Sequence, residues 1–299
     1  MAFAARTSAA ALSLGLALAC AAGRQATLGT GDAEREPREL AYAEAGAGPP
    51  IVIIHGAYGD LRTFSRALPL LGSSHRVVAV SLRYHWPNPW PASDEEAYAG
   101  YTVEAHARDV VALLEQLGLG PVDLVGHSYG GNVAAMVASS RPDLVRRLVL
   151  VEPALRRLLR DVPGGPELIA ENAKGRPELL ARLRGGEDSV SVLRSVLPGL
   201  DSAAPDRRRI AVANARTLGP LLAHPADQTR FSCDDARRIQ SPLLLVQGEL
   251  TDRQYREIVA RLAACQPEAR TVVLSGSRHV VQVDAPEALA RAVLEFVDH

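Results

Sequence analysis

The chain has 299 residues, of which 47% are hydrophobic and 22% are charged. This balance is that of an ordinary globular protein with a substantial core, and it argues against disorder along the whole length. The formal net charge is −1 at pH 7, so the chain has no excess of positive charge with which to bind a polyanion. We therefore expect no nucleic-acid partner.

Residues 1–19 have the pattern of an export signal. Arg6 precedes an apolar run that ends in small residues before Cys20, and this run is shorter than the roughly 20 residues that a membrane-spanning helix needs. Residues 17–19 suit a signal peptidase, whereas residues 16–20 also resemble a lipobox, in which Cys20 would carry lipid and anchor the protein to a membrane. The alternative is an Ala-rich tail behind a misassigned start codon. We expect export, to the periplasm or as a membrane-anchored lipoprotein.

The first half of the chain contains continuous apolar runs that predict β-strands. Residues 20–38 lack periodicity and are predicted to be a linker. Buried strands of the parallel-sheet type are then predicted at 51–54, 77–80, 122–125 and 148–151. Apolar residues at helical spacing predict a helix over 102–117, and small residues predict another over 132–140.

Strand signals cease between residues 155 and 235, where helical segments are broken by proline and glycine. Strands resume at 243–246 and 271–274, with helices predicted at 253–264 and 286–297. The alternation of strands and helices predicts an α/β fold with a doubly wound, mostly parallel sheet. We therefore expect an α/β core of residues 39–153 and 239–299, with a helical cap of residues 154–238 inserted into it.

The pentapeptide Gly126-His127-Ser128-Tyr129-Gly130 joins a predicted strand to a predicted helix and fits the pattern G-x-S-x-G. In this pattern the serine occupies a sharp turn, where bulky neighbours would collide with the backbone. N–H groups at the start of the helix then face an oxyanion formed at the serine. The alternative is an ordinary glycine-rich turn. The strand and the helix on either side favour Ser128 as a nucleophile.

A serine hydroxyl is a weak nucleophile that needs a base within hydrogen-bonding reach. His279 follows the strand at 271–274 and precedes the last helix, and it comes after Ser128 in the chain order that this pattern requires. We expect His127 to point away from the serine. Three further histidines lack a suitable context and should be solvated: His75, His106 and His299. His279 is the predicted base.

These motifs, in this order, resemble the α/β-hydrolase superfamily over residues 40–299. Besides the serine turn and the late histidine, the resemblance rests on His55-Gly56 after the first strand and on Gly248 at the end of a later one. It implies a serine esterase-like protein with a helical cap. It also implies an oxyanion hole formed by the backbone N–H groups of Ala57 and Tyr129, with His55 bracing the loop that carries Ala57.

The acid of the triad is ambiguous in this sequence. Members of the superfamily place an aspartate three residues after the glycine that ends the penultimate strand, but Thr251 stands there and Asp252 is one residue late. Thr251 and Gln254 fit a capping box, which would give Asp252 a structural role. Glu152, at the end of the strand after the serine turn, is favoured because the acid only has to orient the base. Its alternative role is to bind loop amides. Glu249 is a third candidate.

An unusually aromatic loop, residues 83–90, follows the strand at 77–80 and holds both tryptophans of the chain. The loop lies at the carboxyl edge of the predicted sheet, where open α/β folds bind their ligands. Tyr84, His85 and Trp86, together with Tyr58, are therefore predicted to line a substrate pocket, and Tyr129 could add to the same wall. The alternative is a proline-rich loop that packs its own aromatic rings against the core.

Cys233 and Cys265 could pair or remain buried thiols, and no Cys/His spacing suggests a metal site. We expect hydrolysis of a small or medium uncharged carboxylic ester through an acyl-enzyme, with a small-molecule ester as partner and neither cofactor nor metal. One alternative is C–C bond hydrolysis or cofactor-free perhydrolysis on the same scaffold. Another is a non-catalytic ligand-binding protein, which the displaced acid would favour.

Overall fold

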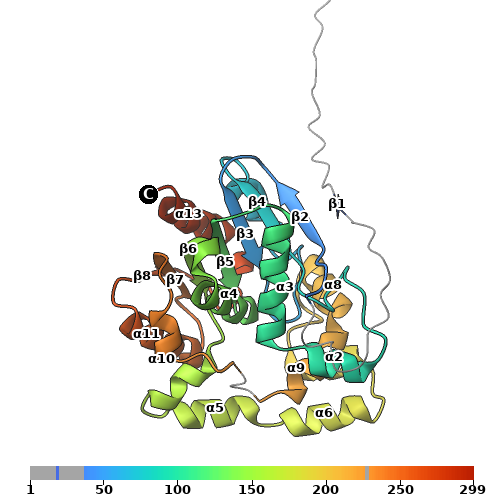
Figure 1. Ribbon diagram of the computed structural model, residues 1–299. Helices are drawn as coiled ribbons and strands as arrows, with labels where there is room; N and C mark the ends of the chain where they lie inside the picture. Colours follow the sequence, from blue (N-terminus) through green and yellow to red (C-terminus); the bar gives the residue numbers. More distant parts are fainter. Residues whose placement is uncertain (1–17, 20–36, 226–228) are drawn as a thin grey trace, which may run out of the picture.

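The computed structural model describes residues 18–19, 37–225 and 229–299 (Figure 1). Of the predicted export signal it describes only Leu18 and Ala19, so Cys20 and nearly all of the predicted linker lie outside the described residues. No helix in the described part of the chain is long and apolar enough to cross a membrane. Export and lipid attachment therefore stay predictions.

A mixed sheet forms the centre of the molecule, with the strand order β1-β2-β4-β3-β5-β6-β7-β8 (Figure 1). Neighbours from β4 to β8 are parallel, whereas β2 is antiparallel to β1 and to β4. This confirms the mostly parallel α/β fold. The strands are β1 (Leu18–Ala19), β2 (Tyr42–Ala45), β3 (Pro50–Ile54), β4 (Arg76–Val80), β5 (Val122–His127), β6 (Val145–Val151), β7 (Leu243–Gly248) and β8 (Arg270–Leu274).

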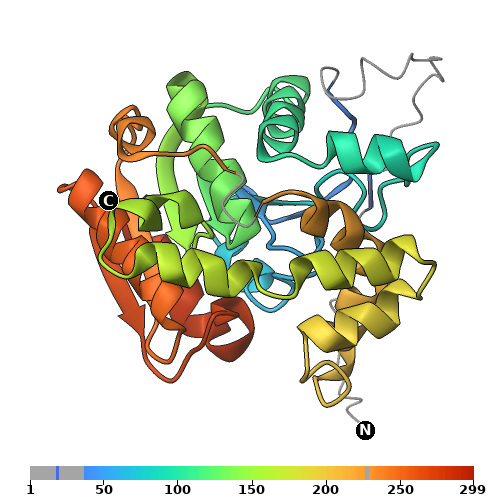
Figure 2. The same cartoon turned by 90° about the horizontal axis from the view of Figure 1, so that it is seen from below.

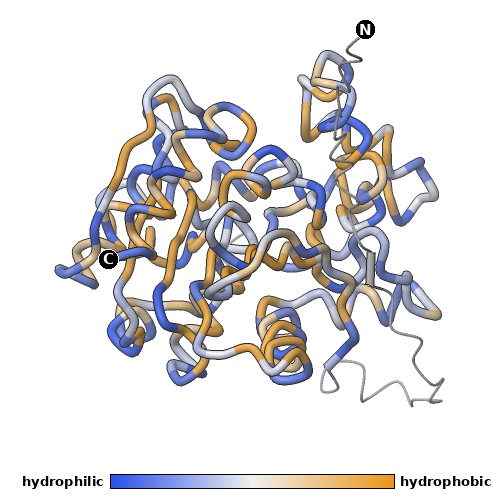
Figure 3. Tube along the Cα trace, turned by 90° about the horizontal axis from the view of Figure 1, so that it is seen from above, coloured by the Kyte–Doolittle hydropathy of each residue, from blue (hydrophilic) through white to orange (hydrophobic). Residues whose placement is uncertain are grey.

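Helices cover both faces of the sheet, because alternate side chains of a buried strand point to opposite sides. In β3, Val52 and Ile54 belong to an apolar cluster that includes residues of α3 (Val103–Gln116), α4 (Tyr129–Ser140) and α11 (Arg253–Cys265), whereas Ile51 and Ile53 belong to a second cluster that includes residues of α1 (Leu68–Leu71) and α13 (Pro286–Val297). Hydrophobic residues accordingly concentrate along the central strands in Figure 3. The helices of the core are α1 (Leu68–Leu71), α2 (Asp94–Gly100), α3 (Val103–Gln116), α4 (Tyr129–Ser140), η1 (Pro142–Leu144), α11 (Arg253–Cys265), α12 (Val281–Asp284) and α13 (Pro286–Val297).

The described residues between β6 and β7 form helices and no strand, and Figure 2 shows these helices lying across one end of the sheet. A separate apolar cluster between Val192 and Leu222 packs against Tyr58, beyond the end of β3. The flanks of this region, at Leu155 and Phe231, belong to the core of the sheet instead. The helices are η2 (Arg156–Asp161), α5 (Gly165–Ala173), α6 (Arg176–Arg184), α7 (Ser189–Val196), α8 (Pro205–Ala213), η3 (Ala215–Thr217), α9 (Leu218–Ala223) and α10 (Cys233–Arg237).

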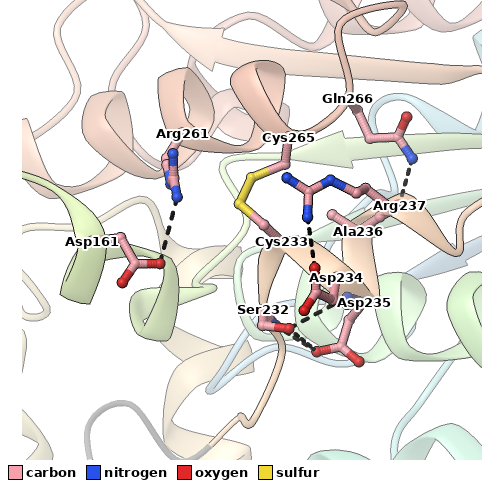
Figure 4. Close-up of a disulfide and its surroundings, with 10 residues drawn as sticks. All are labelled: Asp161, Ser232, Cys233, Asp234, Asp235, Ala236, Arg237, Arg261, Cys265 and Gln266. Carbon is pink, nitrogen blue, oxygen red and sulfur yellow. Dashed lines mark hydrogen bonds and ion pairs between the residues drawn. A yellow bond between two sulfur atoms is a disulfide. The ribbon is translucent and has the colours of Figure 1, made fainter.

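Cys233 at the start of α10 and Cys265 at the end of α11 form a disulfide (Figure 4). The two Cα atoms are 5.3 Å apart, and the residues are separated by 32 positions in the sequence. The pairing that the sequence left open is therefore present. It ties the last of the helices between β6 and β7 to the helix that follows β7.

Removing this disulfide is expected to lower the free energy of unfolding by about 4 kcal/mol, because the open chain regains the entropy of a loop of this length. Denaturation in urea with and without a thiol reductant measures the difference. The Cys233→Ser/Cys265→Ser variant is the control, since its stability should not respond to the reductant. A wild-type protein whose stability is also unaffected by the reductant would contradict the expectation.

Candidate active site

Ser128 lies on a sharp turn between the end of β5 and the start of α4, with a φ of 53° and a ψ of −115°. A residue other than glycine rarely adopts a positive φ, and such strain costs on the order of 1–3 kcal/mol. The flanking glycines permit the turn. A Cβ atom at Gly126 would lie 2.4 Å from the carbonyl oxygen of Gly130, and one at Gly130 would lie 2.3 Å from that of His55. The local sequence therefore dictates a sharp turn with the serine, itself 8% exposed, at its tip.

The structure brings Ser128, His279 and Glu152 together. The Nε2 atom of His279 is 3.0 Å from Oγ of Ser128, and its Nδ1 atom is 3.0 Å from Oε2 of Glu152. The Glu152 side chain is fully buried, whereas that of His279 is 26% exposed. A hydroxyl, an imidazole and a carboxylate thus form a continuous chain of hydrogen bonds from the surface into the core.

Glu152 accepts hydrogen bonds from three donors. Besides His279, these are the backbone N–H of Gly248, at 2.7 Å, and the hydroxyl of Thr251, at 2.5 Å. Burial raises the pKa of Glu152, and the bonds from Thr251 and Gly248 oppose this rise. Thr251 occupies the position where the superfamily usually has its aspartate, and in this chain the residue at that position binds the Glu152 carboxylate through its hydroxyl.

The two other candidate acids do not contact His279. Asp252 is the N-cap residue of α11, but its side chain makes no capping hydrogen bond. The predicted capping box that starts at Thr251 is therefore wrong, because the Thr251 hydroxyl donates to Glu152 and the helix begins one residue later. Glu249 accepts bonds from Ser275 and from the N–H of Gly276, and thus braces a surface loop.

Neighbouring side chains hold His279 in place. The ring of Tyr255 stacks on the His279 ring, with centroids 3.9 Å apart and planes 17° apart. Nε2–H of His127 donates to the carbonyl oxygen of His279 at 2.9 Å, and its Nδ1 accepts from Gln282 at 3.2 Å. Burial lowers the pKa of His279 to about 4, and the charge of Arg156 adds to this effect. The imidazole is therefore neutral at pH 7 and able to accept a proton.

The loop after β3 lies against the serine turn. A Cβ atom at Gly56 would be 3.1 Å from Cβ of Ser128. Among the described residues, no acceptor pairs with the backbone N–H of Ala57 or of Tyr129. His55 is buried beneath the loop, where its Nδ1–H donates to the Gly56 carbonyl at 2.8 Å and its Nε2 accepts from the N–H of Leu82 at 3.0 Å. These are the contacts expected of a brace for the loop.

The aromatic loop packs mainly into the core. Tyr84 is buried with its ring 5.6 Å from that of Trp90. His85 is fully buried and uses both ring nitrogens, on the Gly59 carbonyl and the Tyr101 hydroxyl. Neither side chain is accessible to a substrate, so we do not retain them as binding residues. Trp86 is 38% exposed, with the guanidinium of Arg62 over its ring.

Two of the histidines expected to be solvated are buried. His106 is fully buried with Nδ1 2.9 Å from the Tyr129 hydroxyl, and His75 is buried between Ser74 and Asp298. The prediction that these two histidines are solvated was wrong. The sequence did contain a signal for His106, because it follows Val103 by three positions and therefore lies on the apolar face of the same helix.

No cluster of three or more histidine, cysteine or acidic side chains in the described part of the chain could hold a metal ion.

Comparisons with known proteins agree on the fold. A family model described as alpha/beta hydrolase fold matches residues 49–286. The chain is 26% identical over 267 residues to 2-(acetamidomethylene)succinate hydrolase of Mesorhizobium japonicum, covering 87% of this chain and 91% of the relative. It is 36% identical over 263 residues to the sn-1-specific diacylglycerol lipase ABHD11 of Mus musculus, covering 83% and 81%. A thermophilic esterase from Thermogutta terrifontis, solved with malate bound, aligns with a TM-score of 0.70 at 23% identity over 87% of this chain and 93% of that one.

Proposed function

This chain belongs to the α/β-hydrolase fold family, and we propose that it is a serine hydrolase of carboxylic esters. Ser128 would be the nucleophile, His279 the base and Glu152 the acid. The observation that carries this proposal is the unbroken chain of contacts from Oγ through the imidazole to the carboxylate, with 3.0 Å at each step. Such a base activates a serine hydroxyl, and such an acid orients the base and stabilises its protonated form.

The reaction would proceed through an acyl-enzyme. As Oγ of Ser128 attacks the ester carbonyl carbon, His279 takes up the hydroxyl proton and then delivers it to the departing alcohol. The backbone N–H groups of Ala57 and Tyr129 would stabilise the negative oxygen of the tetrahedral intermediate, helped by the positive end of α4. A water molecule, deprotonated by His279, would then release the acid and restore Ser128.

Backbone strain supports the same residues. Among the described residues other than glycine, a positive φ occurs at Ser128 and Glu152 in the proposed triad, and at Tyr58 and Tyr84. Tyr58 directly follows the proposed oxyanion residue Ala57. Strained conformations persist only where the surrounding structure enforces them, and they cluster at active sites. Two of the four positions are therefore proposed triad residues, and a third is adjacent to the proposed oxyanion residue.

The named relatives support carbonyl hydrolysis more than any single substrate. Their names state a succinate derivative, a diacylglycerol and an unspecified ester. These substrates share an acyl carbonyl that a serine can attack, and they differ in size and charge. The choice of substrate must therefore come from residues around the nucleophile.

Covalent labelling tests the proposal. A fluorophosphonate probe is expected to modify the wild-type protein once, as measured by intact mass, and to leave Ser128→Ala unmodified. Ser140→Ala, which alters an exposed serine of the same helix α4, is the control and should be labelled like the wild type. No labelling of the folded wild type would favour a non-catalytic binding protein. Turnover of ring-cleavage diketones without turnover of aryl esters would favour C–C bond hydrolysis.

A further inference from the structure

Arg156 lies beside the proposed triad. It is the first residue of η2 and follows Glu152 by four positions. Its Nε donates to Oε1 of Gln254 at 3.2 Å, and its Nη2 lies 3.5 Å from the hydroxyl of Tyr255. Because the Tyr255 ring stacks on His279, a single aromatic side chain separates this guanidinium from the proposed base.

No carboxylate in the described part of the chain pairs with Arg156, whose partners there are Gln254 and Tyr255. Many other arginines of the chain do have an acidic partner, such as Arg62 with Asp60 and Arg146 with Asp123. Arg156 is half-buried, and a partly buried charge without a counter-charge is unfavourable unless a ligand completes it. Its amide and hydroxyl partners orient the guanidinium without neutralising it.

Two further arginines of the inserted helices add positive charge. Arg176 of α6 donates only to the carbonyl oxygens of Leu221 and His224 among the described residues. Arg176 and Arg156 both oppose the burial that raises the pKa of Tyr58 to about 12. Arg207 of α8 joins Arg156 in lowering the pKa of His279, after the larger effect of burial.

The acids that face the same place do not cancel this charge. Glu152 is fully engaged by Gly248, Thr251 and His279. Asp252 is exposed at the start of α11 and makes no ion pair with a described residue. The donors that bind Glu152 are neutral groups and leave its charge in place, so three cationic side chains act on the region around the nucleophile against two carboxylates, those of Glu152 and Asp252.

We propose that Arg156 binds a carboxylate of the substrate, so that the ester cleaved at Ser128 is an anion. The inference rests on the proposed function and replaces the uncharged ester that the sequence predicted. A guanidinium can donate two parallel hydrogen bonds to a carboxylate, and it loses its hydration more readily than an ammonium group does. The carboxylate could belong to the acyl part or to the alcohol part of the ester, and the experiment separates these two sources.

Matched esters that differ in one charge test the proposal. The acyl pair is 4-nitrophenyl hydrogen adipate and 4-nitrophenyl hexanoate, and the alcohol pair is 4-acetoxybenzoate and its methyl ester. In at least one pair, the wild type is expected to prefer the anion. Arg156→Gln should then lower kcat/KM for that anion by about 10- to 100-fold, mainly through KM, as expected for the loss of hydrogen bonds to a charged group. The neutral ester should change less than about 3-fold, since it makes no such bonds.

Two controls and a binding measurement complete the experiment. Arg157→Gln alters the adjacent arginine, which makes none of these contacts, and should leave both pairs unchanged. Arg156→Lys should recover part of the preference, because it keeps the charge but not the paired donors. Equal losses on the anionic and neutral esters in Arg156→Gln would overturn the inference. If the wild type cleaves none of the four esters, the proposed ester hydrolysis fails for these substrates. Calorimetric binding of adipate to the wild type but not to Arg156→Gln would then still support the carboxylate site, and its absence would refute it.

Discussion

Replacing Glu152 with glutamine is expected to lower kcat for ester hydrolysis by about 10⁴-fold, the loss seen when the acid of a serine triad becomes an amide. The reason is specific to this site. Three donors converge on the carboxylate, from Gly248, Thr251 and His279. An amide has a single acceptor oxygen, so its NH₂ group would face a donor or force the imidazole into the wrong tautomer. Steady-state kinetics with an activated ester measure the effect.

The control variants are Asp252→Asn and Glu249→Gln, each of which removes a carboxylate that makes no contact with His279. Both should keep kcat within about 3-fold of the wild type, because neither acid orients the base. A large loss in Asp252→Asn combined with a small loss in Glu152→Gln would transfer the role of the acid to Asp252. Thermal melting of each variant shows whether a loss of activity is merely a loss of folded protein.

The free energy of unfolding is expected to fall steeply as the pH drops below 6.5, because burial lowers the pKa of five histidines in the folded protein: His55, His85, His106, His127 and His279. In the unfolded chain each titrates near its ordinary value of 6.5. The unfolded chain therefore binds protons first as the pH falls. The stability is fully present above pH 6.5 and is lost toward the folded pKa, which is about 4 for His279 and about 3 for His127.

The expected loss in the free energy of unfolding is large. Each histidine contributes about 1.4 kcal/mol per pH unit once its unfolded form is protonated and its folded form is not. The four histidines whose pKa is lowered furthest in the fold, His85, His106, His127 and His279, together remove about 5 kcal/mol between pH 6 and pH 5. Denaturation in urea at a series of pH values measures the slope, which should correspond to about four protons, with His55 adding to it at the upper end of the range. Burial also raises the pKa of Glu152 and Asp109. In these two groups the folded state binds the proton first, so they partly offset the loss at lower pH.

Substituting single histidines checks the origin of the slope. His106→Gln should reduce the proton uptake on unfolding by about one, because it removes one group that is neutral in the fold and charged outside it. Ser140→Ala, which alters an exposed residue without a titratable group, should leave the slope unchanged. A stability that stays flat between pH 7 and pH 5 would contradict the expectation for all five groups.

The parallel strands could be predicted from sequence because a strand buried on both faces is a continuous apolar run, as in residues 51–54 and 148–151. The strand β2 (Tyr42–Ala45) was not predicted, since Tyr-Ala-Glu-Ala contains no such run and its pairing with β4 is set by tertiary structure. The burial of His106 and His75 was not predicted either, because it also depends on partners elsewhere in the fold. A buried histidine with a hydrogen-bonding partner looks like a polar residue in the sequence.

The proposed nucleophile and base follow from local motifs, whereas their surroundings depend on contacts between distant segments. The sequence favoured Glu152, but only the structure shows that the Thr251 hydroxyl is engaged with it. Arg156 meets Gln254 and Tyr255 across 98 and 99 positions of sequence. Spacing and periodicity carry no information about such pairs, so the sequence could not predict the stacked tyrosine or the cationic environment around the nucleophile.

Glu152 and Arg156 share the short segment through which the chain leaves β6 and enters the inserted helices. The residues that connect the α/β core to the inserted helices thus include the proposed acid and the proposed carboxylate-binding residue within five positions. In a chimaera of related proteins, a crossover just after Asp161 would replace the inserted helices, with Arg176 and Arg207, and keep the proposed carboxylate-binding residue Arg156. A crossover between Pro153 and Arg156 would import the donor's preference together with its helices. The position of the crossover within this segment, more than the identity of the cap, would then decide which substrate charge the hybrid accepts.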